Sequence, residues 1–318
     1  MKITINILCL LSVVLISQLV FAQKTIKEYV TKTNPEKIKK SIVLEGLPVT
    51  KSAKSFRDGH SKWPLLTSTD QLPDTVALVT FHVNDLGVTT YTKGSYVTFI
   101  DNVNVGEEQG NAIANEMHRH TIASLKEEFA KRGVVLLTPT EFLNTPEKIS
   151  FYYDEFSPQI SKLGNLLSNV ENRAMDIAVG ADTYRYFDMA ATYDHLRSES
   201  LGYELANMLG VDAVLSIGFT IQSTAKEIYF RNVRMALHAP NPIEKLDKKY
   251  VAQKTGNGYN TGQLFTGGYL AFKDPFKIVE KKDRKVSTLD IDGLEIVLNT
   301  MVEHYYDTMN GAIEKVSK

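Results

Sequence analysis

Cysteine is nearly absent from this sequence. The 318 residues contain a single cysteine, Cys9, which lies inside an apolar stretch near the N-terminus. One thiol excludes a disulfide framework and a cysteine-rich zinc site. Cys9 also lies early in the apolar stretch, without the small residues that precede a lipid-modified cysteine, which argues against lipidation.

An excess of charge of one sign is missing too. The chain carries 36 basic and 37 acidic side chains, a formal net charge of −1. Such a balance creates no overall electric field that would attract nucleic acid or an anionic membrane. We therefore expect no nucleic-acid partner.

Long hydrophobic runs are confined to the N-terminus. Lys2 precedes an apolar run over residues 3–19, and Ala22 is the small residue expected before a signal-peptidase cut. The pattern predicts a cleaved signal peptide over residues 1–22. An uncleaved membrane anchor is the alternative, because the run approaches the roughly 18–20 residues that span a bilayer. After cleavage we expect a periplasmic or secreted body with no thiol and no transmembrane span.

The common catalytic motifs are missing as well. The sequence contains neither Gly-x-Ser-x-Gly nor His-Glu-x-x-His. His118 and His120 lie two positions apart, about 200° around a helix, so they cannot share one metal ion. We expect His118 to be a hydrogen-bonded core residue and His120 to meet Glu116 at the polar edge of the helix. A dispersed serine, histidine and aspartate set stays open, with five more histidines available: His60, His82, His195, His238 and His304.

Two short segments bear only a superficial likeness to ligand-binding loops. Residues 256–262, GNGYNTG, lack the Gly-Lys-Ser/Thr of a phosphate-binding loop. Residues 290–293, DIDG, would need calcium ligands at Thr288 and Asn299, and these residues leave both ends of the cage incomplete. We therefore expect no cofactor and no metal, and we assign Asp292 to helix capping.

Composition divides the mature chain into two parts. Residues 23–73 are rich in lysine and have few apolar periods, which predicts a basic N-terminal arm. We interpret this arm as a solvated extension, with docking to a partner or an anionic surface as the alternative. Residues 74–318 read as one α/β domain with an insertion at about residues 140–195.

Apolar periodicity predicts a strand–helix–strand core at the start of this domain. Residues 75–84 form a continuous apolar run typical of a central strand, and residues 95–100 are its expected hairpin partner. Residues 107–133 show the periodicity and the terminal charges of a complete helix. Residues 134–139 follow as the next strand, which favours a right-handed parallel crossover.

A second helix and a hairpin follow the insertion. The helix over residues 198–210 ends at a glycine and is expected to face inward with Leu201, Leu205, Met208 and Leu209. Residues 212–223 and 227–240 predict an antiparallel hairpin with a bulge near Arg231. We expect residues 240–287 to be rich in loops.

The chain ends in a long amphipathic helix. Asp292 and Glu295 suggest a capping box at its start. The whole pattern predicts an α/β fold with a mixed β-sheet packed by helices. Its order is a strand–helix–strand core, a helix, an antiparallel hairpin and the long C-terminal helix.

Aromatic residues gather in the insertion over residues 140–195. The simplest interpretation is that they fill its underside. Asp154, Glu155 and Asp188 lie beside them, and paired carboxylates near aromatics suggest a hydrolase as an alternative function. We expect the insertion and the loops around residues 256–268 to contact a partner through Tyr152, Tyr153, Phe156, Tyr184, Tyr186, Tyr259 and Phe265.

Four segments together resemble a known family. They are VALVTF at residues 76–81, KRGVVLL at 131–137, LGVDAVLSIGF at 209–219 and RNVRMAL at 231–237. Their order is similar to that of the envelope α/β domain shared by CsgG, LpoB and the N-terminal domain of TolB. The chain departs from that family at residues 239–242, where Ala-Pro-Asn-Pro replaces its usual Asp and Thr-Gly turn.

The resemblance implies a periplasmic protein without catalysis that acts through contacts with envelope proteins. It supplies no active site and names no partner. Our leading expectation is therefore an exported accessory or binding protein, with a homo-oligomer left open. A secreted hydrolase and a purely structural subunit of an envelope complex are the alternatives.

Overall fold

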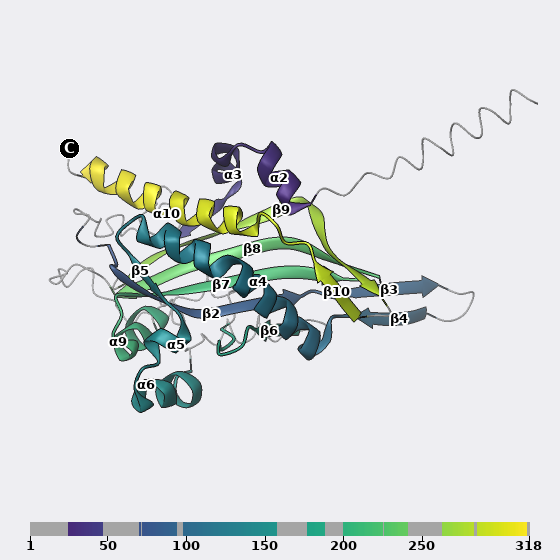
Figure 1. Ribbon diagram of the computed structural model, residues 1–318, viewed down its shortest axis with the longest axis horizontal. Coiled ribbons are helices and arrows are strands. Elements are labelled where there is room, and N and C mark those ends of the chain that lie inside the picture. Colours follow the sequence, from purple (N-terminus) through teal and green to yellow (C-terminus); the bar gives the residue numbers. More distant parts are fainter. Residues whose placement is uncertain are drawn as a thin grey trace, which may run out of the picture.

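The computed structural model describes residues 25–46, 70, 72–93, 98–157, 177–187, 200–224, 226–240, 263–282 and 285–316. It has the α/β architecture that the sequence predicts, with an eight-stranded mixed sheet at its centre (Figure 1). The strand path is β1-β9-β8-β7-β2-β5, with β10 paired to β9 and β6 paired to β2. These strands are β1 (Val43–Gly46), β2 (Thr75–Asp85), β5 (Val135–Leu137), β6 (Ile177–Gly180), β7 (Ala213–Ser223), β8 (Glu227–Pro240), β9 (Gln263–Lys282) and β10 (Lys285–Leu289).

β2 is the central strand of the core, as its apolar run predicts. It pairs in parallel with β5 on one side and with β7 on the other. The helix between β2 and β5 is α4 (Gly106–Ala130), and Gly133, at φ 75°, provides the turn after it. Only glycine adopts such a φ without strain, so the predicted helix stop at Gly133 is confirmed.

One face of the sheet is apolar and lies under two long helices. α4 and α10 (Leu294–Val316) lie next to each other across it (Figure 1). The inward face of α4 contains the residues that its periodicity predicts, with Ile113, Met117 and Leu125 fully buried. At the start of α10, Glu295 accepts from the backbone N–H of Gly293, while Asp292 pairs with Lys27.

The N-terminal arm is part of this core rather than a solvated extension. α2 (Ile26–Lys32) and α3 (Pro35–Ser41) bury Ile26 and Ile38 completely, and β1 pairs with β9 at the edge of the sheet. The solvated interpretation is therefore wrong for residues 26–46. The arm has few apolar residues, but two of them occupy fully buried positions, and burial of such side chains is worth about 1.5–3 kcal/mol each.

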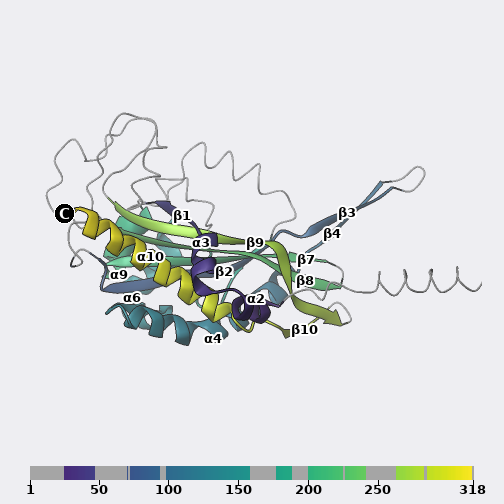
Figure 2. The ribbon, with the colours of Figure 1, turned by 90° about the horizontal axis from the view of Figure 1, so that it is seen from above.

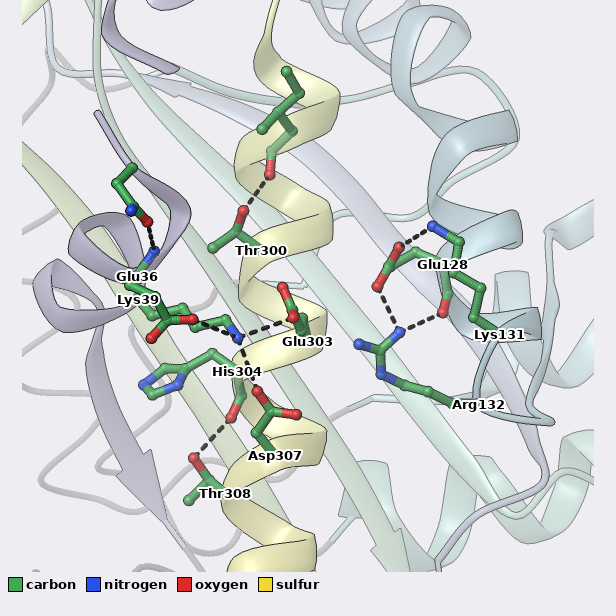
Figure 3. A network of polar contacts seen from close by, with 12 residues as sticks. Glu36, Lys39, Glu128, Lys131, Arg132, Thr300, Glu303, His304, Asp307 and Thr308 are labelled. Atoms are coloured by element: carbon green, nitrogen blue, oxygen red, sulfur yellow. Dashed lines mark hydrogen bonds and ion pairs between the residues drawn. The ribbon is translucent and has the colours of Figure 1, made fainter. Parts of the chain in front are cut away.

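An ion-pair cluster holds α3 on α10. The Lys39 ammonium lies 2.9 Å from a carboxylate oxygen of Glu303 and 2.9 Å from one of Asp307, both on α10 (Figure 3). Burial of Lys39 opposes its charged form, yet the hydrogen bonds to Asp307 and Glu303 raise its pKa above the ordinary value. The lysine-rich arm therefore contributes a specific docking contact as well as charge.

The hairpin of β7 and β8 forms as predicted, with its bulge. The register shifts where Thr220 pairs with Asn232 and Ile221 pairs with Phe230, so Arg231 is the extra residue. β9 is a correction, because residues 263–282 form a strand of 20 residues where we expected loops. The register between β8 and β9 shifts at the same place, so Pro275 lies in an irregular part of β9, where a proline is tolerated.

A second, smaller core covers one end of the opposite face. Short helices and π-helical turns supply buried residues to it: α5 (Pro139–Phe142), η3 (Phe151–Glu155), η5 (Ser200–Leu205) and α9 (Ala206–Leu209). The exposed helix α6 (Pro146–Ser150) connects α5 to η3. Leu201, Leu205 and Leu209 face inward as expected, whereas Met208 is 44% exposed, which corrects its predicted place. The stretch before Ala206 is π-helical, so a strict α-helical period places its neighbours wrongly.

The predicted partner of β2 is also corrected. Residues 98–103 form β4 (Thr98–Val103), which pairs with β3 (Val88–Lys93) in a separate two-stranded sheet. β2 pairs with β5, β6 and β7 instead. Within the described ranges, no helix combines the length and the apolar character needed to cross a membrane.

Candidate functional site

The aromatic residues expected to contact a partner lie around η3, and two of them are core residues. Tyr152 is fully buried and Phe156 is 2% exposed. The Tyr152 hydroxyl donates to the carbonyl oxygen of Val79 at 2.7 Å and accepts from the backbone N–H of Arg185 at 2.9 Å. Burial raises the pKa of Tyr152, so its hydroxyl stays neutral. These contacts tie the insertion to β2.

Tyr184 has a packing role as well. Its ring is 8% exposed, and its hydroxyl lies 2.9 Å from Nε2 of His118 on α4. Phe81 packs edge-on against the imidazole, with the ring centroids 5.2 Å apart. Burial lowers the pKa of His118 and raises that of Tyr184. The predicted hydrogen bond of His118 is confirmed, while its side chain is partly rather than fully buried.

Tyr153 and Tyr186 are the surface members of the set. They are 39% and 40% exposed. The Tyr153 hydroxyl donates to the carbonyl oxygen of Thr183 at 2.6 Å, and Thr183 has a φ of 70°, uncommon for a β-branched residue. Tyr186 packs edge-on against His82 at 4.8 Å. A contact role for these two tyrosines stays a prediction.

The expected contact surface is therefore only partly present. Burial gives Tyr152, Phe156 and Tyr184 packing roles, which corrects the expectation that they reach a partner. Tyr259 lies outside the described residues, and Phe265 belongs to β9 but its side chain is not among those described.

Structural contacts hold three of the acids and histidines considered for chemistry: Glu116, His120 and Glu155. Glu116 pairs with Arg119, while His120 lies 3.1 Å from Glu295 on α10, so the expected meeting of Glu116 and His120 is replaced by two other pairs. Glu155 accepts from the hydroxyl of Ser150 at 2.9 Å. His60, Asp188 and His195 lie outside the described residues.

Two more histidines lie inside the fold. His82 is 3% exposed, with Nδ1 3.2 Å from the Thr80 hydroxyl, and His238 is also 3% exposed. Burial lowers the pKa of His238 to about 3. Across the part of the chain that the structure describes, no group of three or more His, Cys, Asp or Glu side chains is arranged to hold a metal ion.

The β3–β4 arm is the most distinctive surface feature of the molecule. This name denotes β3 and β4, which project together beyond the end of the main sheet (Figures 1 and 2). The register runs from Val88 opposite Val103 to Lys93 opposite Thr98. The ladder of the arm contains these two strands alone, as far as the described residues extend. Its two outer edges therefore carry backbone donors and acceptors that another strand can use.

Asp85 ties both ends of the arm to the body. It is the last residue of β2 and is fully buried. Oδ1 accepts from the backbone N–H groups of Gly87 and Ser223, each at 3.0 Å, and Oδ2 accepts from that of Val105 at 2.8 Å. Gly87 precedes β3, Val105 follows β4, and Ser223 ends β7.

Comparisons with known proteins identify no relative of this chain, so its function has to be argued from the β3–β4 arm and its contacts with Asp85. No protein-family model, no curated protein and no solved structure matches the chain. The resemblance to the CsgG, LpoB and TolB domain therefore stays a prediction. The structure thus offers two features that a partner could contact. One is the outer edge of the β3–β4 arm, whose ends are bound by Asp85. The other is the pair of partly exposed tyrosines, Tyr153 and Tyr186, on the opposite face of the sheet from α4.

Proposed function

We propose that this protein is an exported accessory protein of the cell envelope that binds a protein partner through the β3–β4 arm. The expected signal peptide supports export, and the family resemblance supports a role in envelope assembly, secretion or activation. The observation that carries the proposal is the arm itself, which projects beyond the sheet and rests on a buried anchor (Figure 2).

Strand pairing is the mode of recognition that this arm favours. An extended segment of a partner can add a third strand to a two-stranded ladder through backbone hydrogen bonds. An isolated two-stranded hairpin is marginally stable in water, so a third strand would also stabilise the arm. The near-neutral charge of the chain is consistent with a partner recognised by shape and hydrogen bonds rather than by a strong field.

A crosslinking experiment in intact envelopes tests the proposal. A photo-crosslinking amino acid at Tyr91 on β3 is compared with the same group at Arg119, whose side chain on α4 is 74% exposed. We expect a defined crosslinked protein from position 91 and none at position 119. Equal products from both positions, or none from position 91, would contradict the proposal.

A binding measurement with purified partner then separates specific binding from chance capture. In the arm-less variant, residues 89–102 are replaced by Asn-Gly, a two-residue turn that joins Val88 to its cross-strand neighbour Val103. We expect its affinity for the crosslinked partner to fall at least about tenfold, equivalent to ~1.4 kcal/mol. Unchanged affinity, together with turnover of a glycan or an ester by the purified protein, would favour the secreted hydrolase.

A further inference from the structure

We infer that Asp85 is a positioning residue that fixes the direction in which the β3–β4 arm leaves the body. Its carboxylate accepts three backbone hydrogen bonds from three segments of the chain. Gly87 directly precedes β3, Val105 lies two residues after the end of β4, and Ser223 is the last residue of β7 in the main sheet. One side chain therefore links the entry and the exit of the arm to the sheet.

The chemistry of this link requires a carboxylate of this length. Hydrogen bonds to an ionised acceptor are roughly twice as strong as neutral ones, and a buried carboxylate is stable only when such donors surround it. Asp85 is fully buried, so these donors replace water. An asparagine has a single acceptor oxygen, and its NH2 group would face a backbone N–H. The substitution thus removes part of the link while keeping the side-chain shape.

The backbone next to Asp85 strengthens the same link. The N–H of Leu86 donates to the carbonyl oxygen of Ile221 at 3.1 Å, which extends the contact between β2 and β7 by one residue. Gly87 has a φ of 61°, a conformation that turns the chain away from the sheet and that suits glycine. The arm therefore begins at a defined turn and is closed by the bond from Val105 to Asp85.

A fixed arm has a consequence for binding, and this part rests on the proposed function. A binding segment that is already oriented loses less conformational entropy when a partner docks. Asp85 would therefore raise affinity without contacting the partner. The direction of the arm can be measured without any partner, so the inference about Asp85 can be tested independently of the proposed function.

Spin-label distances between the arm and the body provide the test. Thr92→Cys on β3 and Ala123→Cys, an exposed position on α4, receive the labels in the full chain with Cys9→Ser, which leaves these as its two cysteines. We expect a single narrow distance distribution, and we expect Asp85→Asn to broaden it about twofold because the base of the arm opens locally. An unchanged width in Asp85→Asn would overturn the inference.

Asp212 supplies a matched control at the other end of β2. Its carboxylate oxygen Oδ2 accepts from the backbone N–H groups of Thr75 at 2.8 Å and Asp74 at 3.2 Å, far from the arm along the strand. Asp212→Asn makes the same substitution at an exposed carboxylate that accepts backbone N–H groups away from the arm, and it should leave the arm distances narrow. Equal broadening in both variants would show general loosening of the fold and would also overturn the inference.

Hydrogen exchange of the unmodified protein keeps the inference testable if Asp85→Asn does not fold. We expect the amide of Val105 to exchange at least about tenfold more slowly than those of the arm ladder, because it is buried and bound to a carboxylate. Exchange of Val105 as fast as the arm would overturn the inference. Failure of the unmodified protein to capture a partner through the arm, with the expected broadening in Asp85→Asn, would instead count against the proposed function alone.

Discussion

The hydroxyl of Tyr152 lies between the carbonyl oxygen of buried Val79 and the backbone N–H of partly buried Arg185. It donates to Val79 on β2 and accepts from Arg185, so it joins the insertion to the central strand. Tyr152→Phe removes this partner from both groups and leaves the buried Val79 carbonyl without it, so we expect a loss of about 1–3 kcal/mol in the free energy of unfolding. Tyr153→Phe is the control, because that hydroxyl is partly exposed and water can replace it. Urea denaturation of both variants measures the difference, and equal losses would refute the structural role.

The buried imidazole of His238 predicts a dependence of stability on pH. Burial lowers its pKa from 6.5 to about 3, so the folded protein keeps it neutral while the unfolded chain binds a proton below pH 6.5. Its contribution is complete above pH 6.5 and is lost as the pH falls from 6.5 toward 3, by up to about 1.4 kcal/mol per pH unit.

Denaturation between pH 7 and pH 5 checks this expectation. His238→Gln should show a shallower decline in the free energy of unfolding than the unmodified protein. Leu237→Val, a change to the neighbouring buried residue that leaves the imidazole in place, should keep the steeper decline. Parallel curves for the unmodified protein and His238→Gln would remove His238 as the cause.

Single residues differ in how far the sequence determines their place. The role of His118 follows from local helix geometry, since its position between apolar neighbours already directs it inward. The role of Asp85 depends on Ser223, which lies 138 residues away in the chain. A lone aspartate at the end of an apolar run gives no local sign of that contact, so sequence reasoning missed it.

At the scale of elements, the pairing of β1 with β9 depends on Gly268. A Cβ at this position would lie 2.4 Å from the carbonyl oxygen of Val43 on β1 and 3.3 Å from the hydroxyl of Tyr305. We expect Gly268→Ala to push β1 away and to lower the free energy of unfolding by about 1–3 kcal/mol, as overpacking does. Faster hydrogen exchange at Leu44 would show that β1 is the element displaced.

Gly311 offers the opposite case within α10. A Cβ there meets nothing within 4 Å, and alanine is favoured over glycine inside a helix by about 1 kcal/mol. Gly311→Ala should therefore leave the protein unchanged or more stable. If Gly268→Ala also leaves the stability unchanged or higher, the close approach of β1 does not require a glycine at position 268.

The errors at the scale of elements have a common physical cause. β9 contains Gly267, Gly268 and Pro275, residue types that disfavour strands, yet the two glycines lie opposite β1 and β8, and the proline lies where the register shifts. Residues 98–103 do form a strand, but the choice between β2 and β3 as its partner is a question of tertiary structure. For residues 98–103 the sequence therefore indicated the strand, whereas it did not indicate the neighbouring strand.

At the scale of the whole molecule, the two faces of the sheet explain why the fold class was predictable. β2 and β7 carry apolar residues on both faces, which signals helices on both sides. α4 and α10 bury one face, and the short helices of the insertion together with η5 and α9 bury one end of the other. That pattern lies in the sequence itself. The burial of Tyr152, Phe156 and Tyr184 does not, because the same aromatics suit a core or a contact surface.

The separate ladder of the β3–β4 arm leads to a prediction about the whole fold. β3 and β4 pair with each other, and all strands of the main sheet pair among themselves without them. The arm-less variant keeps Gly87, Val105 and Ser223, whose N–H groups donate to Asp85 in the full protein. We therefore expect its free energy of unfolding to stay within about 1 kcal/mol of the full protein. Urea denaturation followed by circular dichroism measures this, and a loss several times larger would mean that the arm belongs to the folding core, not to a contact surface.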